Sequence, residues 1–76
     1  MTNVELLDQK VKASGLRTQF IADALGLSRA GLYLKLKGKS FFTTEEVKKL
    51  CDLLGIRTLR EREAIFFADE VDKKST

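Results

Sequence analysis

Regularly spaced helix-end signals constrain this chain more than any other feature of its sequence. Glycines at positions 15, 26, 38 and 55 each follow a segment with helical apolar spacing, where helices commonly end. Three Thr-x-x-Glu patterns, Thr2–Glu5, Thr43–Glu46 and Thr58–Glu61, open helical segments as capping boxes do. Proline is absent, and no segment alternates with the period of two residues that marks a strand. These signals predict short helices and no strand.

The apolar spacing places five helices in a compact all-α domain. They are expected over about residues 3–14, 18–25, 28–37, 44–54 and 59–71. The chain has 76 residues, enough for one domain, which we place at residues 1–71 with a polar tail at 72–76. The residues expected to face the core are Val4, Leu7, Val11, Ile21, Ala22, Leu25, Leu32, Leu36, Val47, Leu50, Cys51, Leu54 and Ile65.

The residue types that are missing exclude several functions. The chain has no His and a single Cys, so it lacks the usual general acid, zinc cluster and internal disulfide. It is also too short to enclose a sizeable pocket or to carry a second, ligand-sensing domain. We therefore expect no enzyme, metal, cofactor or small-molecule ligand. With no apolar run long enough to span a bilayer and no secretory signal, we expect no membrane partner and a cytoplasmic location.

Positive charge gathers in the first half of the chain. Residues 1–40 hold seven Lys or Arg against three acids, whereas residues 41–76 hold seven against eight. No acid lies between Asp23 and Glu45, a window that contains one arginine and three lysines. A patch of one sign favours an anionic partner, and nucleic acid is the first candidate. The alternative is an ordinary solvated basic face.

Residues 18–37 have the composition of a helix-turn-helix. That motif needs a small residue where two short helices touch and a residue that tolerates positive φ in the turn. Ala22 and Gly26 meet these needs, and Ser28 is a good N-cap for the second helix. The predicted motif therefore consists of helices 18–25 and 28–37 joined at Gly26.

On these residues the chain resembles the lambda-repressor-like family, which includes phage repressors and Cro proteins. The resemblance rests on IADALGLSRAGLYLKLKGK and on FTTEEVKKLCDLLGI, and it covers about residues 4–67. Within the family the chain looks closest to short phage and prophage regulators marked by Leu-Tyr-x-Lys-Leu and Ile-Phe-Phe-Ala. The family usually buries an aliphatic residue near the end of its third helix, where this chain has Lys35.

The resemblance implies a DNA-reading helix over residues 28–37. With Leu32 and Leu36 inward, a helical wheel turns one set of residues toward base edges: Arg29, Ala30, Tyr33 and Leu34. Arg29 suits guanine, while Ala30 and Leu34 suit the thymine methyl group. Alternatives remain open: a phosphate or solvent position for Arg29, loop packing or phosphate contact for Tyr33, and a core or dimer position for Leu34. The candidate phosphate contacts are Arg17, Thr18, Gln19, Ser28, Gly31, Lys35, Lys37 and Lys39.

The adjacent Phe66 and Phe67 suggest a partner surface. A helix cannot bury both neighbours against one narrow stripe, so one ring is expected in the core beside Phe20 or Phe42. The other is a candidate dimer contact, and a broad buried face that takes both rings is the alternative.

The favoured function is a sequence-specific regulator of double-stranded DNA, a Cro-like phage or prophage repressor that binds a palindromic operator as a homodimer. The alternatives are an interaction module of the same fold that antagonises another phage regulator, and an antitoxin.

Overall fold

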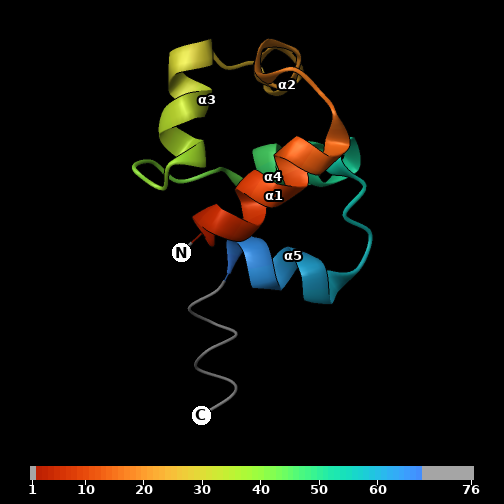
Figure 1. Ribbon diagram of the computed structural model, residues 1–76. Helices are drawn as coiled ribbons and strands as arrows, with labels where there is room; N and C mark the ends of the chain where they lie inside the picture. The colour runs from red at the N-terminus through yellow and green to blue at the C-terminus, as the bar shows by residue number, and fades with distance from the viewer. Residues whose placement is uncertain (1, 68–76) are drawn as a thin grey trace.

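The computed structural model describes residues 2–67, and its regular structure is entirely helical. Within this range no strand occurs, which confirms the all-α prediction. The predicted domain end at residue 71 and the tail at 72–76 lie outside the described residues. The five helices are α1 (Val4–Ser14), α2 (Thr18–Leu25), α3 (Arg29–Leu36), α4 (Thr44–Leu54) and α5 (Leu59–Phe66) (Figure 1).

Two of the predicted N-terminal caps are formed. At α4 the box is complete, because Thr43 Oγ1 accepts from the Glu46 N–H and the Glu46 carboxylate accepts from the Thr43 N–H. At α5 Thr58 Oγ1 accepts from the Glu61 N–H at 3.1 Å. Acidic residues in the first turns, Glu45 and Glu46 in α4 and Glu61 in α5, also complement the helix dipoles.

The predicted cap at Thr2 is wrong by one residue. Asn3 caps α1, and its Oδ1 accepts from the Leu6 N–H at 3.1 Å. Asparagine is an N-cap at least as good as threonine, so the helix begins one residue later than the Thr-x-x-Glu pattern indicates. The Asn3 N–H also donates to the Ile65 carbonyl, which joins the start of α1 to the end of α5.

Gly26 makes the turn between α2 and α3. Its φ is +72°, a left-handed conformation that glycine adopts without a steric penalty. The Leu27 N–H donates to the Ala22 carbonyl at 2.9 Å, and the Gly26 N–H donates to the Asp23 carbonyl. This bond pattern closes α2 and reverses the chain tightly. All four glycines predicted to end helices have positive φ, at positions 15, 26, 38 and 55.

Every helix contributes one large aliphatic side chain that is fully buried, and these are Leu7, Ile21, Leu32, Leu50 and Ile65. Helix α1 packs against α3, α4 and α5, and α2 packs against α3 and α4. Figure 1 shows α1 and α4 in the middle, with the α2–α3 pair on one side and α5 on the other. Because α3 packs at the edge of this assembly, one side of it faces away from the core.

As predicted, one ring of the neighbouring pair Phe66 and Phe67 is buried in the core and the other is not. Phe66 is buried and packs edge-on against Phe42, with ring centroids 5.7 Å apart, whereas Phe20 is exposed. Phe67 is 38% exposed and its backbone has left the helical region. Helix α5 therefore ends at Phe66, before the predicted end at residue 71. Because the Phe66 ring is buried in the core, the predicted dimer contact rests on Phe67.

This separation predicts unequal losses of stability. Phe66→Ala should lower the free energy of unfolding by about 3–5 kcal/mol, because it leaves a cavity beside Phe42. Phe67→Ala should cost less than about 1 kcal/mol, because it removes a ring that is partly in solvent. Urea denaturation followed by circular dichroism measures both values. Equal losses would contradict the assignment of Phe66 alone to the core.

Candidate nucleic-acid interface

The outer face of α3 brings together the four residues predicted to face base edges. Arg29, Ala30, Tyr33 and Leu34 line one shallow depression. Tyr33 is 55% exposed and Leu34 is 48% exposed, although both are large and mainly apolar. On the opposite side of the helix, Leu32 is fully buried. The α3 helix thus presents an apolar surface to solvent, with a guanidinium in its first turn.

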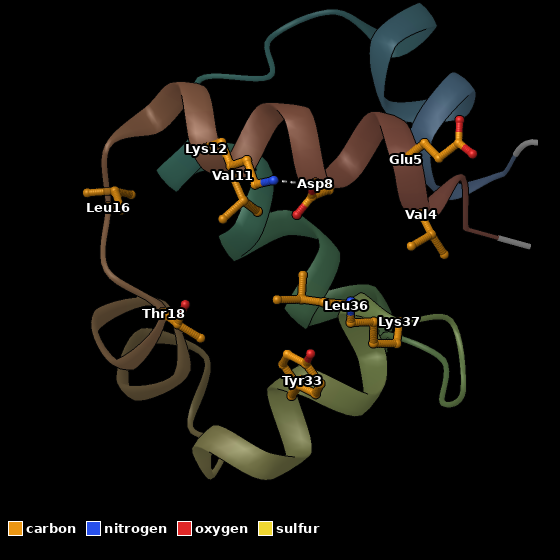
Figure 2. A pocket seen from close by; sticks show the side chains of 10 residues that line it. All are labelled: Val4, Glu5, Asp8, Val11, Lys12, Leu16, Thr18, Tyr33, Leu36 and Lys37. Atoms are coloured by element: carbon orange, nitrogen blue, oxygen red, sulfur yellow. Dashed lines mark ion pairs between the residues drawn. The ribbon is translucent and has the colours of Figure 1, made fainter.

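A groove between α1 and α3 borders this surface. Figure 2 shows Tyr33 and Lys37 on its α3 side and Glu5 and Asp8 on its α1 side. The Lys37 ammonium lies 5.1 Å from the centroid of the Tyr33 ring, a cation–π contact. Asp8 is paired with Lys12 at 3.0 Å. An anionic partner on α3 would therefore meet carboxylates if it extended across the groove to α1.

Exposed cations bracket the outer face of α3. Arg29 lies in its first turn, and Lys37 and Lys39 follow its last. Arg17, also exposed, stands immediately before α2. The electrostatic attraction that each of these cations exerts on a phosphate adds to that of the others. Of these four side chains, Arg17, Lys37 and Lys39 are predicted phosphate contacts and are solvent-accessible, whereas Arg29 is predicted to face base edges.

The other four candidate phosphate contacts, Thr18, Gln19, Ser28 and Gly31, lie within the predicted motif. Ser28 Oγ accepts from the Gly31 N–H at 3.0 Å, which caps α3. A Cβ atom on residue 31 would lie 3.1 Å from that oxygen, so glycine leaves room for the cap. Gln19 Nε2 donates to Asp23 Oδ1 at 2.9 Å, and Thr18 lies on the wall of the groove in Figure 2.

Lys35 is held inside the fold and is removed from the candidate phosphate contacts. Its Nζ donates to Glu46 Oε1 at 2.5 Å, and both side chains are largely buried, with exposures of 14% and 13%. The ammonium also lies 6.0 Å from the centroid of the Phe42 ring. Because the Glu46 carboxylate neutralises the Lys35 ammonium, this lysine attracts phosphate only weakly. Lys35 thus takes the inward position where the resemblance led us to expect an aliphatic residue.

Glu46 is the acceptor that joins α3 to the start of α4. Burial alone would raise the pKa of the Glu46 carboxyl. The hydrogen bond from Lys35, the backbone bond from Thr43 and the Lys35 charge outweigh burial, so the pKa lies below its ordinary value of 4.5. The carboxylate is therefore ionised at neutral pH and holds the end of α3 against the cap of α4.

Sequence reasoning missed Phe41. Its ring is 77% exposed, and together with Phe67 it borders a second apolar depression. The buried wall of this depression includes Phe66 and Val47. The adjacency of Phe41 and Phe42 in the sequence could have predicted this exposed ring. The same adjacency at Phe66 and Phe67 led us to expect one buried and one exposed ring. One ring of each pair enters the core and its neighbour stays outside.

The protein-family model of the BetR domain matches residues 2–63, which include α1 to α4 and most of α5. The chain belongs to the BetR domain family. No curated protein and no solved structure matches this BetR-domain chain significantly. Its finer resemblance to lambda-repressor-like regulators stays a prediction. Among residues 2–67, none of the BetR-domain helices is long and apolar enough to cross a membrane.

The Glu46 site predicts a pH-dependent loss of stability. Since its folded pKa is lowered, the stabilisation is complete well above pH 4.5 and is lost as the pH falls through the folded-state value. Glu46→Gln should lower the free energy of unfolding at pH 7 by about 1.5–3 kcal/mol, the range for hydrogen bonds to charged groups. It should also flatten the acid limb of the curve of stability against pH.

Glu61→Gln is the matched control, because the Glu61 carboxylate accepts from Lys10 Nζ at 2.8 Å and its side chain is 41% exposed. Its loss should be the smaller of the two, since solvent screens that pair. Urea denaturation at a series of pH values measures both variants. If Glu61→Gln destabilised the domain as much as Glu46→Gln, burial of the Lys35–Glu46 pair would not account for the effect.

Proposed function

We propose that this chain is a sequence-specific regulator that binds double-stranded DNA with α3 in the major groove. The observation that carries the proposal is the outer face of α3, which is exposed, mainly apolar and bracketed by cations. A major groove is wide enough to admit a helix, and it displays base edges and thymine methyl groups. The short turn at Gly26 and the buried contact of α2 with α3 support this use of the helix.

In this proposal the cations position the domain and α3 reads the sequence. Arg17, Lys37 and Lys39 contact phosphates, and Arg29 donates two hydrogen bonds to a guanine. Lys35 takes no part, because it is paired with Glu46. The carboxylates on α1 limit the DNA-facing surface on one side of α3.

A Cro-like repressor that acts as a homodimer is the finer form of the proposal. One small domain covers a single half-site, so two copies would lie about 34 Å apart on a palindromic operator. The partly exposed Phe67, with Phe41 beside the same depression, is the candidate dimer contact. In the BetR-domain chain Phe67 directly follows α5 and Phe41 lies in the loop before α4, and their depression shares no residue with the one on the outer face of α3.

The second candidate function is a protein-interaction module that antagonises another regulator or serves as an antitoxin. The specific observation in its favour is the large apolar area exposed on Tyr33, Leu34 and Phe41. DNA is the favoured partner, because Arg29 and Lys37 flank Tyr33 and Leu34 with positive charge.

Selection from a pool of random DNA duplexes tests the function. The expected result is enrichment of one motif, present as two inverted half-sites about one helical turn apart. Phe67→Glu should retain the fold and the half-site preference but weaken binding to the paired sites. Enrichment of no motif, together with capture of a protein partner by purified domain, would favour the interaction module.

Lys37→Ala should reduce the salt dependence of binding. The logarithm of the binding constant is expected to fall linearly with log[salt], with a slope of about −0.9 per phosphate neutralised. Removal of Lys37 should make that slope shallower by about one unit and leave the sequence preference unchanged. Lys12→Ala, which removes a cation paired on α1, is the control and should not alter the slope. Titrations at four salt concentrations measure both, and an unchanged slope for Lys37→Ala would exclude its phosphate contact.

Arg29→Lys should separate base reading from charge. Lysine keeps the positive charge but lacks the planar fork that matches guanine O6 and N7. The variant should keep the salt slope and lose about 1–3 kcal/mol of discrimination at one base pair of each half-site. Binding to the selected duplex and to its single-base variants at fixed salt measures this loss. Equal weakening on every duplex would instead assign Arg29 to a phosphate.

A further inference from the structure

The polar groups on α3 are too few to read a DNA site by hydrogen bonds alone. Of its eight residues, Leu32 is buried, Leu36 is half-buried and Lys35 is paired with Glu46. Gly31 has no side chain. The residues that remain for base edges are Arg29, Ala30, Tyr33 and Leu34.

This set lacks the side chains that usually identify three of the four bases by hydrogen bonding. Asparagine and glutamine read adenine, carboxylates accept from cytosine, and none of these occurs on α3. Arg29 supplies one guanine contact. An A·T pair can still be identified by its 5-methyl group, which presents an apolar surface in the major groove.

Ala30 and Leu34 form the apolar pair suited to that methyl group. They are four residues apart on α3, so their side chains are neighbours on one face. Leu34 is 48% exposed, and no described residue covers the depression that it shares with Ala30. Tyr33 borders this depression and also the groove on the α1 side, where Figure 2 shows its ring beside Lys37.

We propose that Ala30 and Leu34 read the 5-methyl groups of thymine, so that thymine methyls together with one guanine specify each half-site. This inference rests on the proposed function and names the chemistry that α3 recognises. DNA is the occupant of the apolar face because the cations Arg29 and Lys37 stand at its two ends, where they meet phosphate or guanine acceptors rather than an apolar protein surface.

Replacing thymine by uracil in the selected duplex tests the proposal, because uracil lacks only the methyl group. Wild-type protein should bind more weakly by about fourfold for each methyl group that α3 contacts, the factor expected for one buried CH₂-sized group. Leu34→Ala should bind the thymine duplex more weakly and should show little further loss when the thymine beside it becomes uracil. Fluorescence anisotropy at fixed salt measures the four combinations of protein and duplex.

Leu59→Ala is the matched control, since Leu59 is an exposed leucine at the start of α5. It should bind the thymine duplex as wild type does and keep the full loss on uracil. Circular dichroism establishes that each variant is folded.

The outcomes separate the two proposals. Equal wild-type binding to thymine and uracil duplexes, with the motif and salt slope intact, would overturn thymine reading and leave the regulator standing. A Leu34→Ala variant that retains the full uracil loss would likewise overturn the assignment to Leu34. If no duplex motif is enriched at all, the proposed function fails, and the inference fails with it.

Discussion

Every helix of this domain is too short to be stable alone, so the fold depends on the shared core. An isolated helix of eight or eleven residues, the lengths found here, is marginal in water. Each helix places one aliphatic side chain where water cannot reach it. Burial of apolar surface is the dominant favourable contribution to folding. In a chain of this size the shared core is small, and each helix depends on its neighbours to remain folded.

The same dependence explains how α3 can hold an exposed apolar face. Leu32 anchors one side of the helix in the core, and the turn at Gly26 sets its direction relative to α2. Near its other end, Lys35 donates to Glu46, which also completes the cap of α4. A helix held near both ends is pre-organised, so it loses little conformational freedom when a partner binds its outer face.

Local chemistry made much of this predictable from the sequence. Glycine at positive φ and an oxygen side chain at an N-cap are local requirements, which is why helices α2 and α4 lie at their predicted bounds. The Thr2 prediction failed because two good capping residues are adjacent there, and only the observed bond selects Asn3. The helical periodicity was also enough to predict the outer face of α3. When Leu32 faces the core, Leu34 must face solvent.

The helical architecture and the set of residues on the outer face of α3 could be predicted from the sequence, because both follow from contacts within a few residues. The partners of Lys35 and Phe66 could not be predicted in this way, because they depend on how the helices pack against one another. Lys35 lies in an acid-free window, yet Glu46 from the next helix neutralises it across the fold. Phe66 and Phe67 have the same chemistry, and packing against Phe42 buries the first while the second stays partly in solvent. The basic surface therefore contains one cation fewer than the sequence indicates, because partners distant in sequence meet only in the folded chain.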